Sequence, residues 1–443
     1  QGPSFGWWDM PDQFTLAKLD AEEVSKTARQ PLFVFYPTVS THTPFSPLAP
    51  YQPDWAKMLA YPTPKLTPEE QRFLDVETAE LCRLTKDWDC TQRQDMPTEV
   101  WRYMKEKGFF GMIIPKEFGG LGFGPVEQQI FINEANRADV PLPLVTLQTV
   151  GPTLQVYGTE EQKKKFLPGI LSGEVHFAIG YSEPEAGTDL ASLRTTAVRH
   201  GDEYIVNGQK MWTTGAHDAD YVWLACRTDP TAAKHKGISI LIVDTKDPGY
   251  SWTPIILSDG AHHTNASYYN DVRVPADMLV GEENGGWKLI TTQLNHERVG
   301  LGPAGRVAGI YEQVHAWASA AGSDGVVPLD NPEAQRLLGQ IKSIWRLNEL
   351  LNWQVASSGE NIAVADAAAT KVFSTERIQE VSRLAEELVG RFGNPADKHT
   401  AKVLQWLDTM AKRNLVITFG GGVNEVMREM IAASGLKVPR VSR

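Results

Sequence analysis

The stretch LITTQLNHERVGLG has the spacing of a helix with one apolar face. Its apolar positions stand three, four and seven residues apart: Trp287, Ile290, Leu294 and Leu301. The 3.6-residue period places Glu297 on that same face. Because burying an unpaired carboxylate is costly, Glu297 is either paired or serves chemistry. The pattern alone therefore selects Glu297 as a candidate functional residue.

A second helical signature opens the segment KLTPEEQRFLD. Thr67 suits an N-cap, Pro68 suits the first helical position, and Glu70 stands three residues after the cap. These residues predict a helix that begins with a capping box. Helical spacing continues to about residue 170, with a glycine-rich break at 115–125.

The pattern changes to that of strands between about residues 175 and 280. Asn207–Gly208 lies between two strand-like runs and predicts a hairpin turn. An antiparallel β domain is therefore expected between two helical regions. The segments rich in β-branched and aromatic residues are 203–214, 220–228, 238–245 and 268–275.

Helical spacing returns from Trp287 to the end, with breaks at 323–332, 390–397 and 419–425. The predicted fold class is therefore α+β, with helical, β and helical domains in that order. The first 61 residues are rich in proline and aromatic side chains and remain unassigned. The expected boundaries are 1–61, 62–174 (N-terminal helical), 175–282 (middle β) and 283–443 (C-terminal helical).

Composition excludes several classes of function. The 443 residues carry a net charge of −11 and a sequence pI near 5.5, without the basic surplus typical of nucleic-acid-binding proteins. No apolar run approaches the roughly 18 residues of a membrane helix, and no signal peptide is recognised. Cys82, Cys90 and Cys226 form no CxxC pair and no metal-binding cluster. We expect a cytoplasmic protein that binds neither metal nor nucleic acid.

Two motifs in the predicted β domain indicate a binding site. The loop GYSEPEAGTDL (180–190) carries glycines that let backbone amides approach a ligand closely. The segment NGQKMWTTGA (207–216) adds an aromatic ring and two hydroxyls that could meet a flat ligand. Taken alone, the first motif could equally be a surface loop. The two together favour one wall of a cofactor site.

The chain resembles the acyl-CoA dehydrogenase family over about residues 62–443. The resemblance rests on motifs in family order: MIIPKEFGGLGFG, YGTEEQKKKFLPGI, SEPEAGTD, EYIVNGQKMWTT, NDVRVPADMLVGEENGGW and FGGGVNEVMREMIA. It implies an N-terminal helical domain, a middle β domain and a C-terminal four-helix domain, with FAD between the last two. The C-terminal half is similar to actinobacterial members that act on steroid side-chain thioesters. Residues 62–125 are more similar to the long-chain enterobacterial type.

The resemblance also implies roles for single residues in the β domain. Those expected to contact the flavin are Ile179, Tyr181, Ser182, Trp212 and Thr214. Thr188 and Arg298 are expected to bind substrate. The structural alternatives are a core aromatic for Trp212 and turn chemistry for Ser182 and Thr188.

The reaction implied is removal of two hydrogens from an acyl-CoA thioester, with electrons passed to an electron-transfer flavoprotein. Most members of the family carry the base at the position of Gly421 here, which has no side chain. In the branch that resembles the isovaleryl and long-chain types, the base falls on Glu297, within LNHERV. A carboxylate on a buried face should have a raised pKa, which suits a general base. The Gly421 N–H could serve as an oxyanion donor.

Alternatives to this assignment remain. Glu297 could instead form a structural ion pair with Arg298 or Arg306. His296 is a weaker candidate because its position on the helix points elsewhere. The enzyme could also be an oxidase that uses O₂, or the chain could be a non-catalytic subunit. Glu297 argues against the last, since an inactive subunit needs no base.

Two departures from the family pattern concern assembly and the N-terminus. The usual Arg-x-x-Phe-Gly string is missing, although Gln335 matches a glutamine that follows it and contacts the FAD site. The family's GGNG string is reduced to GRFGNPAD. The chain is therefore expected to form a homo- or hetero-oligomer (a dimer or tetramer), in which a partner could supply the arginine. Residues 1–60 resemble a fragment of an alkaline-phosphatase/sulfatase-type protein without its nucleophile motif.

Overall fold

The computed structural model describes residues 66–85, 97–140, 142, 145–300, 302–358 and 363–439, with only the backbone described at 148 and 295–300. The chain divides into two units, Gln1–Pro53 and Asp54–Arg443, and every described residue belongs to the second. The predicted segment 1–61 lies outside the described residues.

The N-terminal part is helical, as predicted. Its capping box is confirmed, because Glu70 N donates to Thr67 Oγ1 at 3.3 Å and Thr67 N donates to Glu70 Oε2 at 2.7 Å. Short π-helical stretches at Phe73–Thr78 and Val145–Val150 adjoin these helices. The helices are α3 (Pro68–Arg72), α4 (Ala79–Thr85), α6 (Thr98–Glu106), α7 (Pro125–Arg137), α8 (Gly151–Tyr157) and α9 (Glu160–Leu171).

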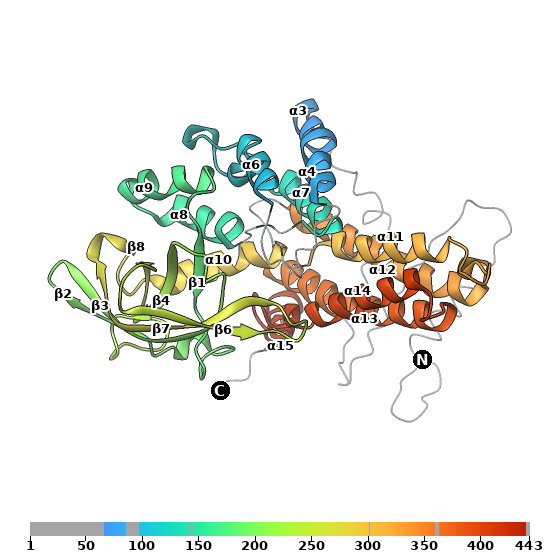
Figure 1. The fold of residues 1–443 in the computed structure, drawn as a ribbon. Coiled ribbons are helices and arrows are strands. Elements are labelled where there is room, and N and C mark those ends of the chain that lie inside the picture. The colour runs from blue at the N-terminus through green and yellow to red at the C-terminus, as the bar shows by residue number, and fades with distance from the viewer. Residues whose placement is uncertain are drawn as a thin grey trace, which may run out of the picture. The chain divides into compact units, whose positions relative to one another are not determined.

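The middle part is one sheet (Figure 1), with strand order β6-β7-β3-β2-β4-β5-β8 and β1 paired to β4. The pairing is antiparallel except for β1 with β4 and a single pair between β2 and β4. This confirms the predicted β domain. The strands are β1 (Phe177–Gly180), β2 (Thr196–His200), β3 (Glu203–Thr214), β4 (Tyr221–Arg227), β5 (Ile238–Asp244), β6 (Tyr250–Ile256), β7 (His262–Pro275) and β8 (Leu279–Val280).

The Asn207–Gly208 hairpin prediction is wrong. β3 continues through this pair and shifts register against β7 there. A Cβ on Gly208 would lie 2.4 Å from Thr195 Oγ1, so glycine is needed where two backbones pass closely. Asn207 Nδ2 donates to Asp271 Oδ1 at 2.9 Å. Pairing with neighbouring strands on both sides therefore overrides the local turn preference and leaves a bulge.

The C-terminal part consists of long helices that share one hydrophobic core. Residues of α11, α12, α13 and α14 form this core, which includes Val307, Leu338, Leu388 and Leu407. These helices run side by side in Figure 1, which agrees with the expected four-helix domain. The helices are α10 (Gly286–Gly300), α11 (Ala304–Ala318), α12 (Pro332–Ser357), α13 (Val364–Phe392), α14 (Lys398–Arg413) and α15 (Asn424–Met430).

Two contacts hold the helices close to their neighbours. A Cβ on Gly305 would lie 1.8 Å from Asn133 O, so glycine lets α11 approach α7. Leu289 and Ile290 at the start of α10 belong to the same hydrophobic core as the sheet. Helix α10 therefore begins against the β domain. Among the described residues, no helix is both long and apolar enough to cross a bilayer.

Candidate active site

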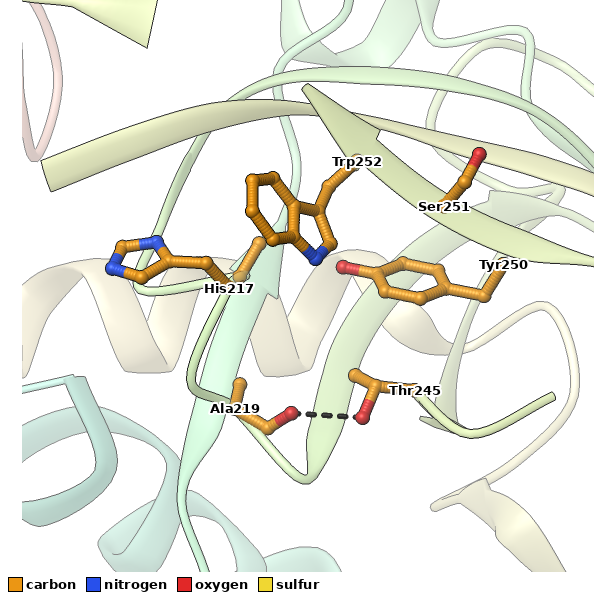
Figure 2. A pocket seen from close by; sticks show the side chains of 7 residues that line it. His217, Ala219, Thr245, Tyr250, Ser251 and Trp252 are labelled. Carbon is orange, nitrogen blue, oxygen red and sulfur yellow. Dashed lines mark hydrogen bonds between the residues drawn. The ribbon is translucent and has the colours of Figure 1, made fainter. Parts of the chain in front are cut away.

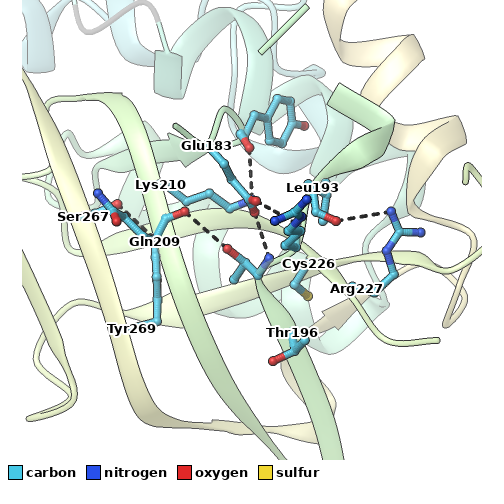
Figure 3. Close-up of polar contacts among 12 residues, drawn as sticks. Glu183, Leu193, Thr196, Gln209, Lys210, Cys226, Arg227, Ser267 and Tyr269 are labelled. Carbon is cyan, nitrogen blue, oxygen red and sulfur yellow. Dashed lines mark hydrogen bonds and ion pairs between the residues drawn. The ribbon is translucent and has the colours of Figure 1, made fainter. Parts of the chain in front are cut away.

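The loop that follows β1 is held by a buried ion pair (Figure 3). The Lys210 ammonium lies 2.8 Å from Glu183 Oε1 and donates to Tyr181 O at 3.0 Å. The Glu183 carboxylate also accepts from Thr195 N at 2.9 Å and Arg194 N at 2.6 Å. Sequence reasoning missed this pair, which joins residues 27 positions apart.

The charge state of this pair follows from its hydrogen bonds. Burial opposes ionisation of Glu183, but the charge and hydrogen bond of Lys210, with the two backbone N–H groups, outweigh burial and lower the pKa of the carboxyl. Lys210 is fully buried. The ion pair therefore fixes the backbone of Tyr181 and Ser182 against β3. Met211 N of β3 also donates to Ser182 O of the loop at 2.8 Å.

A bulge at the end of β3 presents Trp212 to solvent. Lys210 pairs with Ser267 and Thr213 pairs with Asn265, so β3 carries one more residue than β7 here. Trp212 takes a left-handed φ of 61° and is 56% exposed. A tryptophan in that conformation is strained, which makes the exposed ring a functional candidate rather than a core residue. Thr214, at the strand end, is also exposed.

A buried asparagine connects this bulge to a pair of histidines. Asn265 Nδ2 donates to Thr213 O at 3.2 Å and to His217 Nδ1 at 3.0 Å. His262 Nε2 donates to Asn265 Oδ1 at 2.8 Å, and the two imidazoles pack against each other at an interplanar angle of 32° with centroids 4.2 Å apart. Burial lowers the pKa of His217 despite the opposing charge of Asp218. No motif in the sequence pointed to this network.

A cavity of about 430 Å³ adjoins His217 (Figure 2). The Tyr250 hydroxyl points toward the Trp252 indole and has no hydrogen-bond partner in the structure. None of the sequence-predicted site residues lines this cavity. Its lining residues are Ala216, His217, Ala219, Thr245, Tyr250, Ser251 and Trp252.

Helix α10 contacts the loop through Tyr181. The Tyr181 hydroxyl donates to Gln293 Oε1 and accepts from Trp223 Nε1 at 3.2 Å. Gln293 is fully buried, and its Nε2 has no hydrogen-bond partner. Position 297 follows position 293 by one helical turn. The candidate base is therefore carried by the same helix, one turn beyond this contact.

The remaining predicted residues lie elsewhere. Gly421 sits in the turn before α15 with a φ of 66°. Gln335, on the first turn of α12, donates through Nε2 to Leu329 O at 2.8 Å. Thr188 is exposed in the loop after β1, and Ile179 is half-buried on β1. Ile179, Tyr181, Ser182, Trp212 and Thr214 thus lie on or beside neighbouring backbone segments, while Gln335 makes no described contact with them.

Arg306, the alternative partner of Glu297, has another role in the described contacts. Its Nε donates to Asn136 Oδ1 at 3.0 Å, which connects α11 to α7. The side chains of Glu297, Arg298 and His296 lie outside the described residues. No group of three potential metal ligands occurs in the part of the chain that the structure describes.

The family models match the chain in three consecutive segments. They are the acyl-CoA dehydrogenase N-terminal domain at residues 69–174, the middle domain at 178–272 and the C-terminal domain at 284–436. The acyl-CoA dehydrogenase FadE29 of Mycobacterium tuberculosis is 77% identical over 344 residues, which cover 78% of this chain and 89% of FadE29. The chain belongs to the acyl-CoA dehydrogenase family.

Other relatives agree with this assignment. The acyl-CoA dehydrogenase FadE26 of M. tuberculosis is 46% identical over 78% of this chain and 88% of its own length. The ChsE4-ChsE5 complex from M. tuberculosis has a chain that is 42% identical, with a TM-score of 0.77 over 85% of this chain and 99% of that one. The structure of the Tcur3481-Tcur3483 steroid ACAD contains a chain that is 44% identical to this one. Its TM-score is 0.75, over 85% of this chain and 99% of that chain.

Membership settles the class of enzyme and corrects one prediction. As a member of the acyl-CoA dehydrogenase family, the chain is an oxidoreductase, and members of the family are flavoproteins. The resemblance of residues 1–60 to an alkaline-phosphatase/sulfatase fragment is not borne out, since the family-model matches begin at residue 69. Short aromatic and proline-rich strings carry too little spacing information to identify a family.

The described residues fit a flavin. An exposed, strained Trp212 ring stands beside the backbone that joins Ser182 to Met211, which suits a flat ring ligand. The buried Gln293 Nε2 has no hydrogen-bond partner, and an unsatisfied buried donor lowers the stability of the fold by about 1–3 kcal/mol. The exposed Trp212 ring is therefore the feature that suits a flat ligand, while the Gln293 amide lies in the protein interior beside Tyr181.

Proposed function

We propose that this acyl-CoA dehydrogenase uses FAD to oxidise the α,β bond of an acyl-CoA thioester, with Glu297 removing the α proton. The observation that carries the proposal is the buried contact of Gln293 with Tyr181, one turn before Glu297. This contact supports a position for residue 297 beside the flavin-facing loop. The family's usual base position is Gly421, which has no side chain to act.

The chain's residues would divide the chemistry between them. The α C–H bond releases its proton to the Glu297 carboxylate, while the Gly421 N–H donates to the thioester oxygen as negative charge develops there. When bound, FAD would accept the hydride from the β carbon, so that a Cα=Cβ bond forms. Thr188 and Arg298 would bind the substrate. Ile179, Tyr181, Ser182, Trp212, Thr214 and Gln335 would contact the FAD.

The proposed substrate class is an acyl-CoA with a bulky, steroid-like side chain, and the proposed acceptor is an electron-transfer flavoprotein. The 44% identical structure described as a steroid ACAD supports the substrate class. Structures of related chains are complexes of two named proteins, which supports a hetero-oligomer. The missing Arg-x-x-Phe-Gly string gives a reason for a partner, because that arginine would have to come from another chain.

The visible spectrum of the purified chain tests this function. Flavin absorbance that bleaches anaerobically on addition of an acyl-CoA supports dehydrogenation. A colourless chain that gains FAD only with a second, unlike chain supports the shared site. Rapid reoxidation of the bleached enzyme by air would favour an oxidase. A flavin that no acyl-CoA bleaches, with or without a partner, would contradict the proposal.

A further inference from the structure

The turn that carries Gly421 has little in its own sequence to fix its shape. It reads FGGGV at residues 419–423, and the φ angles of Gly421 and Gly422 are 66° and 102°. Consecutive glycines have many accessible conformations. Phe419 does not anchor the turn, because its side chain is 68% exposed. Phe419 N and Gly420 N donate to Val416 O at 3.0 and 3.3 Å, which fixes the start of the turn, whereas the contacts that hold the glycine peptides that follow come from beyond it.

Lys371, a buried residue of α13, holds this turn at several points. Its Nζ donates to Thr418 O at 3.1 Å, to Gly422 O at 2.8 Å and to Asn424 Oδ1 at 2.7 Å. An ammonium has three N–H donors, so one lysine can hold several oxygens of the turn at once. The acceptors lie on both sides of Gly421. The Lys371 side chain is fully buried, which strengthens these charge-assisted hydrogen bonds.

A second layer of contacts holds Asn424 itself. Its Nδ2 donates to Thr375 Oγ1 and to Glu376 Oε1, each at 3.1 Å. Arg428 Nη2 donates to the same Glu376 oxygen at 2.6 Å. Thr375 and Glu376 follow Lys371 by about one turn of α13. The turn is thus attached to one rigid helix through polar contacts.

We propose that Lys371 is a positioning residue for dehydrogenation: it fixes the Gly421 peptide so that its N–H meets the thioester oxygen. The inference rests on the proposed role of Gly421. Three glycines occupy 420–422, so the turn has no side chain of its own there, and the Lys371 ammonium holds the backbone on both sides of Gly421.

Hydrogen exchange of the holoenzyme tests the positioning directly. Lys371→Met removes the donors and keeps an unbranched, apolar side chain of similar length. Amides in a peptide covering 416–426 should exchange about tenfold faster than in the wild type, while those of α12 stay unchanged. Lys402→Met is the matched control, since Lys402 is an exposed lysine of α14 and should alter neither peptide.

Rapid mixing with an acyl-CoA that bleaches the wild type tests the consequence. Removal of an oxyanion donor costs about 10²–10³ in rate, so its displacement should slow flavin reduction about 10- to 100-fold. The dissociation constant of the substrate should change less than about threefold, because the neutral thioester gains little from that donor. A general loss of folding would instead raise the dissociation constant and lower flavin content together.

Each outcome decides the question. Unchanged reduction and unchanged exchange in Lys371→Met overturn the inference while leaving the proposed function intact. A wild type that no acyl-CoA reduces removes the proposed function, and the inference with it. If Lys371→Met does not fold, Asn424→Ala serves instead, because it removes one of the three acceptors. It should accelerate exchange of the same peptide and slow reduction by a smaller factor, and no change in either would overturn the inference.

Discussion

Two fully buried lysines hold two loops of this acyl-CoA dehydrogenase, but in different chemical surroundings. Lys210, on β3, pairs with the Glu183 carboxylate and holds the loop after β1. Lys371, on α13, donates to two backbone carbonyls and to Asn424, and reaches the Glu376 carboxylate through that asparagine. The first contact joins opposite charges directly, whereas the contacts of Lys371 include the dipoles of a glycine-rich turn.

The difference predicts different consequences of losing each lysine. Without Lys210, a buried carboxylate would remain without its counter-charge, which affects stability most. Without Lys371, the carbonyls of a turn at the protein surface lose their donor, which affects geometry more than stability. A similar arrangement can therefore stabilise the fold in one place and position a reacting group in another.

Lys210→Met should have the largest effect on stability. Breaking a buried ion pair by removing one partner costs about 3–5 kcal/mol. Urea unfolding followed by circular dichroism would measure this. The double variant Glu183→Gln/Lys210→Met should recover part of the loss, because it removes the stranded charge. A loss below about 1 kcal/mol for the single variant would show that solvent reaches Glu183 and replaces the lysine.

Lys371→Met should cost less stability than Lys210→Met. Leaving neutral acceptors without a donor costs about 1–3 kcal/mol, and the turn can relax toward water. The same urea titration gives the value, with Lys402→Met as the exposed-lysine control. Equal losses of unfolding free energy in Lys371→Met and Lys210→Met would contradict this difference between the two lysines. The contacts of Lys371 would then stabilise the fold as much as the ion pair does.

The pH dependence should also separate the two lysines. The folded-state pKa of Glu183 lies below its usual value, so the stability from this group is present above about pH 4.3 and is lost as pH falls through the folded pKa. Lys210→Met raises that folded pKa toward the unfolded one. The stability gap between wild type and Lys210→Met should therefore narrow below about pH 4.3, while the gap for Lys371→Met changes little. Unfolding at pH 7, 5 and 3.5 would check both.

Trp212→Gly should have the smallest effect on the stability of the flavin-free protein. Glycine adopts a positive φ without strain, and the lost ring is largely exposed, so the change should stay within about 1 kcal/mol. Thermal unfolding of the apoprotein measures it. FAD binding should nevertheless weaken. A loss above about 2 kcal/mol would mean that Trp212 packs as a core residue, which was the structural alternative.

Local patterns predicted much of the fold, whereas the candidate site residues came mainly from the family resemblance and stay predictions. The capping box at Thr67 and Glu70 was readable because both residues act within one turn. The turn prediction at Asn207–Gly208 was wrong because contacts with two neighbouring strands decide the shape of this pair. Gly208 lies against Thr195 and Asn207 bonds to Asp271, and neither partner is close to the pair in sequence.

The supporting contacts of the site could not be predicted for the same reason. Glu183 and Lys210 are 27 residues apart, and Lys371 and Asn424 are 53 apart. A single sequence does not reveal which distant polar residues meet inside a folded protein. Family motifs selected Ser182 and Trp212 as candidate flavin contacts, but they did not reveal the ion pair and the bulge that hold these residues in place.

The rate of anaerobic flavin reduction in Glu297→Gln, compared with wild type and Glu425→Gln, tests the central claim most directly. Glu425 is an exposed carboxylate beside the glycine turn and serves as the control. If Glu297 removes the α proton, Glu297→Gln should bind acyl-CoA and FAD normally but reduce the flavin at least about 10²-fold more slowly. Glu425→Gln should match the wild type. Reduction at the wild-type rate in Glu297→Gln would contradict the account.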